Sequence, residues 1–365
     1  MSKNYIIPIF VPFFGCPHKC IFCDQEKITG SISPLDGEKD IAVEDIINEH
    51  LTTILAKKNK KKRIEIGYYG GSFTGLPFNI QEKLLTPAKK LLKKEIINGI
   101  RVSTRPDFVT SETMALLREY KVDTIELGVQ SFAEDVLDIA ERGHGIKEIY
   151  EAAKIIKGAG MRLGIQLMIG LPGDTLEKTV AGAKAACTLF PDFVRIYPVI
   201  VLKGTELATR YERAMFKPWG VNQVVEAAKQ IYYVFFNQNV EVIRIGLQDS
   251  RALKDDYYLA GPYHPAMGEM VQAAVFFEMI CYLIEDKLLR LSGEIFIFCA
   301  VGDESKVRGQ KSDNLSKLRE KYPKIRIIIK PTPLFTKDTI GIAINCESFP
   351  EILLTKQEFI GFQRI

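Results

Sequence analysis

The chain has 365 residues, 47% hydrophobic and 26% charged, a composition typical of a folded protein with a sizeable core. Its 49 Lys and Arg against 45 Asp and Glu give a formal net charge of +4, too small to indicate a partner. No long uncharged apolar run predicts a membrane span, and the N-terminus lacks the cleavage site of a signal peptide. Seven cysteines, three clustered and four scattered, do not suggest a disulfide framework and predict a reducing, cytoplasmic location.

Short β-branched runs alternate with amphipathic helical runs from the N-terminus to about residue 245. Each predicted strand is followed by a predicted helix, and the turns between them are rich in glycine and polar residues. Such a series predicts a parallel sheet covered by helices, but periodicity alone leaves an open sheet and a barrel as alternatives. The six predicted strands lie at 4–13, 63–71, 99–107, 122–130, 161–173 and 192–204.

The pattern changes near residue 250, which predicts a core domain over 1–250 and a small α+β domain over 251–365. In the second domain a helix is expected after residue 265, followed by strands at 293–302 and 325–333 that flank a helix. Residues 303–337 contain ten Lys or Arg against four Asp or Glu, a local excess of +6. Such a run is typical either of a solvated helix face or of a surface that follows a phosphate backbone.

Three cysteines gather in the stretch FFGCPHKCIFCD, directly after the first predicted strand. Cys16, Cys20 and Cys23 have the spacing C-x3-C-x2-C, one thiol short of a closed structural zinc site. His18 is an alternative fourth ligand, although its place between two of the cysteines makes a shared metal hard to reach. A four-iron cluster held by three thiolates keeps one iron open for a ligand. The spacing therefore favours an iron–sulfur cluster, with a partial zinc site or unligated thiols as alternatives.

The C-x3-C-x2-C loop after a first strand, with the aromatic Phe22 before the last cysteine, resembles the radical S-adenosylmethionine (SAM) superfamily. The resemblance implies a partial (β/α)6 TIM-like barrel, here followed by a small C-terminal α+β appendage. It also implies a [4Fe-4S] cluster whose open iron binds the amino and carboxylate groups of SAM. Reduction of the cluster, by a donor such as flavodoxin or ferredoxin, would cleave SAM to methionine and a 5′-deoxyadenosyl radical.

Two further motifs fit this resemblance, at the ends of the second and third predicted strands. In YYGGSFTGLP, Gly70 and Gly71 would receive the ammonium group of SAM through the backbone. Ser72 stands where the family often has Glu, so a backbone role is expected for this turn. In STRPD, Ser103 and Arg105 occupy the place where relatives contact the ribose or methionine part of SAM.

Three more motifs follow in the expected order. Gln130 in ELGVQS matches a SAM contact of oxygen-independent coproporphyrinogen oxidase, and Glu126 should share its face of the strand, unless it is an edge carboxylate paired with a lysine. Arg142 in ERGH resembles the arginine that holds the SAM carboxylate with two hydrogen bonds. In GIQLMIGLPGDT, Gln166 would bind the ribose and Ile169 the adenine, although Ile169 could equally be ordinary core.

The glycine turn and the later motifs resemble most the radical SAM core of the catalytic subunit of Elongator, which modifies the wobble uridine of tRNA. This chain ends at Ile365, which leaves too little room for the acetyltransferase domain of that family, so acetyl-CoA chemistry is not expected. We therefore predict a tRNA-modifying, transferase-like radical SAM enzyme with SAM and RNA as partners and no membrane. The alternatives are a radical SAM enzyme acting on a small molecule or peptide, and a zinc-stabilised binding module.

Overall fold

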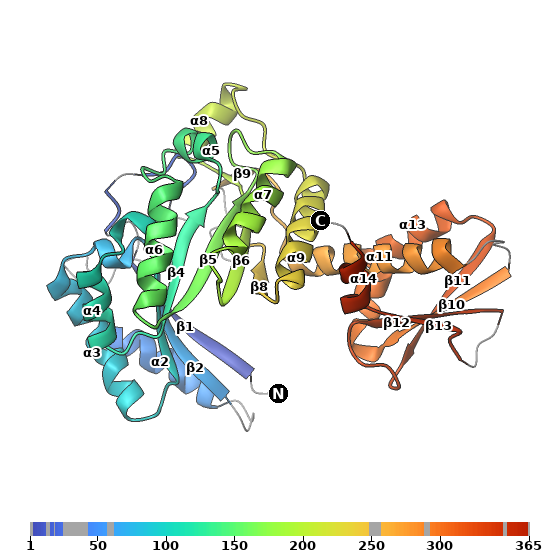
Figure 1. The fold of residues 1–365 in the computed structure, drawn as a ribbon, viewed down its shortest axis with the longest axis horizontal. Helices are drawn as coiled ribbons and strands as arrows, with labels where there is room; N and C mark the ends of the chain where they lie inside the picture. The colour runs from blue at the N-terminus through green and yellow to red at the C-terminus, as the bar shows by residue number, and fades with distance from the viewer. Residues whose placement is uncertain are drawn as a thin grey trace. The chain divides into compact units, whose positions relative to one another are not determined.

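The computed structural model describes residues 3–11, 15–17, 19–24, 43–56, 62–247, 257–287, 293–345 and 349–363. The chain divides into two compact units (Figure 1). Unit 1 comprises Met1–Trp219, Val240–Ile243 and Leu247–Tyr263, and unit 2 comprises Gly220–Asn239, Arg244–Gly246 and His264–Ile365.

Unit 1 is built on a seven-stranded sheet in the order β1-β2-β3-β4-β5-β6-β8. The pairings from β1 to β6 are all parallel, and the strands follow one another in chain order, as successive β-α-β crossovers produce. The predicted α/β partial barrel of the radical SAM type is confirmed, and β8 is a strand that the sequence analysis missed. The strands are β1 (Lys3–Val11), β2 (Lys62–Gly70), β3 (Gly99–Thr104), β4 (Thr124–Gln130), β5 (Arg162–Ile169), β6 (Phe193–Pro198) and β8 (Glu241–Ile245).

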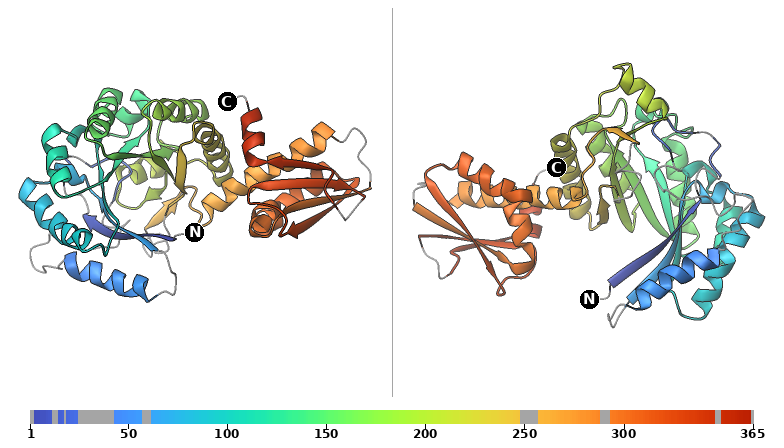
Figure 2. Two further views of the ribbon diagram at one scale, coloured as in Figure 1. Left: turned by 60° about the horizontal axis from the view of Figure 1, so that its bottom comes forward. Right: turned by 180° about the vertical axis from the view of Figure 1, so that it is seen from behind.

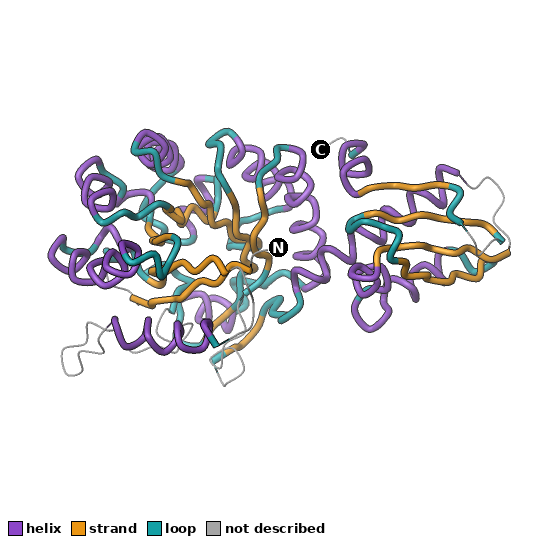
Figure 3. The backbone as a smooth tube through the Cα atoms, turned by 90° about the horizontal axis from the view of Figure 1, so that it is seen from below, coloured by secondary structure: helices purple, strands orange, loops and turns teal. Residues whose placement is uncertain are grey.

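The helices of unit 1 surround its strands (Figure 3). They are α2 (Val43–Leu55), α3 (Phe78–Lys93), α4 (Ser111–Glu119), α5 (Glu134–Ile139), α6 (Ile146–Gly158), α7 (Leu176–Cys187) and α8 (Glu206–Glu212). Short 3-10 helices follow β2 at Phe73–Gly75 (η1) and β3 at Pro106–Phe108 (η2), and β7 (Val201–Leu202) pairs with β9 (Tyr258–Ala260).

Side chains alternate between two faces along each strand of this sheet. On β2, Ile64 and Ile66 are buried, and the Tyr68 hydroxyl donates to the Leu84 carbonyl of α3 at 2.6 Å, so these residues face the helices. Glu65 and Tyr69 therefore lie on the opposite, inner face. The sheet thus packs its apolar face against helices and lines its inner face with polar groups.

Among its described residues, unit 2 combines a four-stranded sheet in the order β11-β10-β12-β13 with five helices (Figure 2). β10 pairs in parallel with β11 and antiparallel with β12, which confirms the predicted α+β character. The strands are β10 (Gly293–Ala300), β11 (Ile325–Thr332), β12 (Thr339–Ile344) and β13 (Ile352–Thr355). The helices are α9 (Val221–Asn237), α11 (Met267–Lys287), α12 (Glu304–Arg308), α13 (Asp313–Lys321) and α14 (Lys356–Phe362), with 3-10 turns at Val301–Asp303 (η3) and Gln310–Ser312 (η4).

Helix α11 is long and apolar enough to cross a membrane, although Glu269 and Glu278 keep it from being the long uncharged run that the sequence analysis considered. Over Met267–Glu285 its mean hydropathy is 1.5, so by length and composition alone it qualifies. However, 56% of this window is buried inside the structure, and Phe276 and Ile280 pack in one cluster with Ile295 and Ile297 of β10. A core helix passes the same test, and core packing explains this composition.

Candidate functional site at the carboxyl ends of the strands

The cysteine loop follows β1 and lies at the carboxyl end of the sheet. Cys20 is 7% exposed, whereas Cys16 and Cys23 are half-buried. The amide of Ile21 donates to the Ala140 carbonyl at 3.3 Å, and the Ile21 carbonyl accepts from the amide at the start of α8 at 2.8 Å. The loop is therefore tied to the segments after β4 and β7. His18, the alternative zinc ligand, lies outside the described residues.

The start of the cysteine loop interlocks with the glycine turn that follows β2. Gly15 has a φ of +74°, and a Cβ placed on it would lie 2.1 Å from the Ser72 carbonyl oxygen. A Cβ on Gly75 would lie 2.2 Å from the Gly15 carbonyl oxygen. Gly70 has a φ of +107°, and the Gly71 amide donates to the last residue of β1 at 2.8 Å. Only glycine permits these backbones to approach so closely.

Arg142 lies beside the buried thiol of the loop. It is 5% exposed, and its Nη1 donates to Cys20 Sγ at 3.0 Å while its Nη2 donates to the Gly128 carbonyl at 2.7 Å. Glu141 and Gly143 on either side have positive φ, so a sharp turn after α5 aims this side chain inward. A cation is thus placed against a predicted iron ligand 122 residues away in sequence.

Arg105 lies next to this pair. Its guanidinium donates to both carboxylate oxygens of Asp107, at 3.0 Å each. It also donates to the backbone carbonyl of Arg142. Burial raises the pKa of the Cys16 thiol, and the charge of Arg105 opposes that rise. Burial also lowers the pKa of His144 to about 4, with the Arg142 cation acting in the same direction, so this imidazole is neutral near pH 7.

Gln130 ends β4 with a buried polar atom that has no partner. Its φ is +70°, and the pairing of β4 with β5 is irregular between Gly128 and Gln130. The Oε1 atom is buried and accepts no hydrogen bond from the described residues. Leaving a buried amide oxygen unpaired costs about 1–3 kcal/mol. A ligand that donates to this oxygen would recover that cost.

Glu126 lies deeper on the inner face and is fully buried. Its Oε1 accepts from the Tyr69 hydroxyl at 3.0 Å and Arg101 Nη1 at 2.9 Å, and its Oε2 accepts from Arg195 Nε at 2.7 Å. Arg101 also pairs with Glu65. Because β4 is the fourth of seven strands, Glu126 is not an edge carboxylate, and its partners are arginines rather than a lysine. The structure places it within an ion network instead of beside the cysteine loop.

The remaining predicted residues divide between the two faces. Gln166 Nε2 donates to Ser103 Oγ at 3.3 Å on the inner face. The Ser72 hydroxyl is fully buried and bonds to Thr104 Oγ1 at 2.9 Å. Phe22 packs in an apolar cluster below the loop. Side chains alternate between the two faces of β5, and Ile169 lies three positions after Gln166. The side chain of Ile169, which is 1% exposed, therefore faces the helices, away from Gln166.

Tyr69, Arg101 and Arg195 are inner-face residues that the sequence analysis missed. A signal was present, because the polar residues of β2, β3 and β6 that alternate with apolar ones fall on one face, namely Arg63, Glu65, Tyr69, Arg101, Ser103, Arg195 and Tyr197. In a strand with one face on helices, that period marks the opposite face. Burial of the Tyr69 hydroxyl, together with the nearby negative charge of Glu126, raises the pKa of Tyr69 well above its usual value, so Tyr69 stays a neutral hydrogen-bond donor.

Comparison with known proteins identifies the family. The radical SAM superfamily model matches residues 10–184, and the radical SAM C-terminal domain model matches residues 191–275. An uncharacterised protein of Methanocaldococcus jannaschii is 30% identical over 232 residues, which cover 61% of this chain and 70% of the relative. The chain belongs to the radical SAM superfamily. This membership replaces the zinc-stabilised module as an explanation of the cysteine loop.

Two further relatives of this radical SAM protein come from Methanocaldococcus infernus. A tRNA uridine(34) acetyltransferase is 26% identical over 259 residues, which cover 62% of this chain but only 48% of the relative. The solved structure of an archaeal Elp3 with an N-terminal deletion superposes with a TM-score of 0.58 at 20% identity, covering 80% of this chain and 66% of that one. The second likeness establishes the fold alone.

Members of the radical SAM superfamily hold a [4Fe-4S] cluster and SAM, so these are the cofactors of this protein. The residues present fit them, since three thiols, a buried guanidinium and an unpaired amide oxygen gather at one edge of the sheet. No group of three His, Cys, Asp or Glu that could hold a metal ion is found within the described segments. The thiolates of a four-iron cluster bind separate irons, so they need to surround a volume rather than one point.

Proposed function

We propose that this radical SAM protein is an enzyme that cleaves SAM reductively and modifies tRNA. The first part, reductive cleavage of SAM, rests on the hydrogen bond between Arg142 and Cys20. This contact places a guanidinium, which suits a carboxylate ligand, beside the cysteine loop. The second part, modification of tRNA, is supported by the similarity to tRNA uridine(34) acetyltransferases and by the basic segment 303–337.

In this proposal Cys16, Cys20 and Cys23 hold the cluster by three of its irons. When bound and reduced, the cluster supplies the electron that divides SAM into methionine and a 5′-deoxyadenosyl radical. Arg142 pairs with the SAM carboxylate, since a planar guanidinium holds a carboxylate by two parallel hydrogen bonds. Gln130 accepts a hydrogen bond from SAM at its unpaired Oε1.

The backbone of Gly70 and Gly71 receives the ammonium group, at a turn where a positive φ brings main-chain atoms forward. Ser103 and Gln166, joined by their hydrogen bond, face the ribose. Glu126 acts as a positioning residue, because its oxygens are occupied by Tyr69 and two arginines. Adenine contact at Ile169 is proposed through its backbone, since its side chain faces the helices.

The proposal is confined to the radical step. The chain spans about half the length of the acetyltransferase relatives it matches, so acetyl transfer is not carried over. We expect the enzyme to work in the cytoplasm with a protein reductant such as flavodoxin or ferredoxin.

The test is an anaerobic assay with dithionite and SAM, with and without bulk tRNA. We expect tRNA to bind, to increase 5′-deoxyadenosine formation, and to exchange label with the deoxyadenosyl methyl group. A rate of deoxyadenosine formation that does not respond to tRNA, together with no tRNA binding, would refute the RNA substrate. That outcome would favour a small molecule or peptide while leaving the cofactor assignment intact.

A further inference from the structure

Unit 2 carries a basic surface formed by α12, α13 and β11, which together contain most of the segment 303–337. Several of its cations are neutralised locally: Lys306 by Asp303 at 3.1 Å, and Arg308 by Glu304 at 2.7 Å. Lys311 is exposed and makes no ion pair with any described residue. The same holds for Arg319 on α13. Lys324 and Lys337 are likewise exposed without an ion pair to a described residue, so Lys311 and Arg319 are two of four such cations in the segment.

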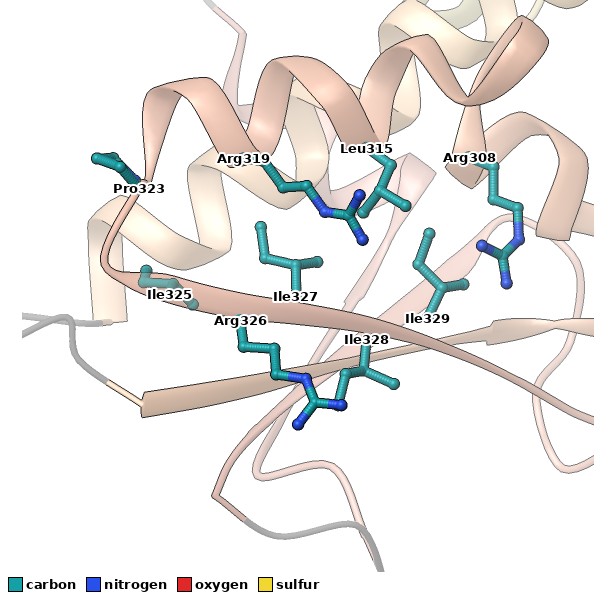
Figure 4. A pocket seen from close by; sticks show the side chains of 9 residues that line it. All are labelled: Arg308, Leu315, Arg319, Pro323, Ile325, Arg326, Ile327, Ile328 and Ile329. Carbon is teal, nitrogen blue, oxygen red and sulfur yellow. The ribbon is translucent and has the colours of Figure 1, made fainter.

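A hollow of ≈ 530 Å³ lies between α13 and the edge strand β11 (Figure 4). Its floor is aliphatic, formed by Leu315, Ile327 and Ile329. The guanidinium groups of Arg308 and Arg319 extend from the helices toward the strand, on either side of Leu315 (Figure 4). Among the described lining residues there is no carboxylate and no aromatic ring.

A second hollow of ≈ 690 Å³ lies next to the first, because Arg308 lines both. Lys306 and Lys311 line the second hollow, and Glu269 is the one acidic residue among the lining residues that the structure describes. Cations therefore line two neighbouring hollows of unit 2. We refer to these two hollows together as the basic track.

The turn that carries Lys311 is held firmly in place. Asn314 is 4% exposed, and its Nδ2 donates to the Ala273 carbonyl of α11 at 2.8 Å and to two carbonyls at the end of α12 at 3.2 Å each. Lys311 and Ser312 both have positive φ, a strained conformation for residues other than glycine. The hydrogen bonds of Asn314 hold the backbone next to this turn, so the side chain of Lys311 starts from a fixed point of unit 2.

We propose that the basic track binds the sugar–phosphate backbone of RNA. This inference rests on the proposed RNA substrate and adds the surface of the protein that holds the RNA. Guanidinium and ammonium groups at the rim pair with phosphates, and the aliphatic floor lies against ribose. Because contacts to phosphate and ribose carry no base information, binding is tolerant of sequence. The track holds the RNA while the site in unit 1 performs the radical step.

The test neutralises two unpaired cations, one from each hollow, in the variant Lys311→Gln/Arg319→Gln. Both substitutions keep the Cβ, so the strained backbone at position 311 is unchanged. The matched control is Lys154→Gln/Lys184→Gln, which removes two charges from exposed positions on α6 and α7 that make no ion pair with the described residues. Binding of tRNA and of a single-stranded oligonucleotide is measured by fluorescence anisotropy between 50 and 200 mM salt.

Each phosphate contact to a single strand contributes about 0.7 to the slope of log K against log salt, so the track variant should lose about 1.4 units of slope. Its affinity at about 100 mM salt should fall at least about tenfold. Deoxyadenosine formation without RNA should stay at the wild-type rate, and circular dichroism should show an intact fold. The control should retain both the slope and the affinity.

The outcomes separate this inference from the proposed function. If wild-type protein binds no RNA, the RNA substrate and the track both fall. If wild type binds RNA but the track variant keeps its slope, the track alone is refuted. An equal loss in the control would mean that bulk charge binds the RNA, and equal competition by polyglutamate would indicate an acidic protein partner; both results contradict the inference.

Discussion

Substitution of Gly75 by alanine tests how the cysteine loop is held against the glycine turn. The added Cβ would lie 2.2 Å from the Gly15 carbonyl oxygen, and real Cβ atoms essentially never come within 3.0 Å of such an atom. The backbone at Gly15 must therefore move by at least about 0.8 Å, because forcing the contact would cost about 1–3 kcal/mol. Cys16 is the next residue, so the movement reaches a proposed iron ligand.

A displacement near 1 Å at a reacting site can cost about 10²-fold in rate. We expect Gly75→Ala to lose iron on anaerobic reconstitution and to form deoxyadenosine at least about tenfold more slowly, with little change in thermal unfolding. The control is Gly158→Ala in α6, where an added Cβ meets nothing within 4 Å. It should behave as wild type in every assay. Wild-type iron content and rate in Gly75→Ala would refute the interlocking of the two loops.

Three further predictions concern buried charges. Glu126→Gln should lower the free energy of unfolding, measured in urea, by about 3–5 kcal/mol, because Arg195 loses its buried carboxylate partner. A loss below about 1 kcal/mol would contradict a stabilising ion network around Glu126. Burial tends to raise the pKa of Glu65, but the charges and hydrogen bonds of Arg101 and Arg63 outweigh that effect. The net shift of the Glu65 pKa is downward from 4.5. The stabilisation from Glu65 is present above pH 4.5 and is lost as the pH falls through the lowered pKa. Glu65→Gln should therefore reduce the dependence of the unfolding free energy on pH on the acid side. An unchanged dependence would contradict the pairing of Glu65 with Arg101. Arg142→Ala should weaken SAM binding, measured by anaerobic calorimetry, by about ten- to a hundredfold, because it removes hydrogen bonds to a charged group. Unchanged affinity would contradict the pairing of Arg142 with the SAM carboxylate.

Local patterns were sufficient to predict the barrel strands. Runs such as GIRVST and TIELGVQ combine β-branched residues with turn signals, and both became strands, although β3 ends at Thr104 rather than at 107 and β4 begins at Thr124 rather than at 122. The strand β8 was missed because Glu241 and Ile243 are exposed at the end of the sheet, so no buried alternation marks it. β12 and β13 are held by pairing with each other and with β10, which local propensity does not reveal.

The candidate site was predictable in its residue types but not in its contacts. Spacing alone identified the thiols, whereas the hydrogen bond from Arg142 to Cys20 joins residues 122 positions apart. Strand periodicity predicts that Glu126 and Gln130 share one face, but it does not reveal the irregular pairing between Gly128 and Gln130 or the partners that Glu126 finds. Arg195 reaches Glu126 from a strand 69 residues later, and only the folded sheet brings the two together.

The central claim is that the three thiols hold a four-iron cluster, and metal analysis of anaerobically purified protein tests it most directly. We predict a brown protein absorbing near about 400 nm, with about four irons and four sulfides per chain. Cys20→Ala should lose the iron and all deoxyadenosine formation, while Cys187→Ala, a cysteine on α7 away from the loop, should keep both. Wild-type protein with neither iron nor sulfide, or a Cys20→Ala variant that cleaves SAM at the wild-type rate, would contradict the account.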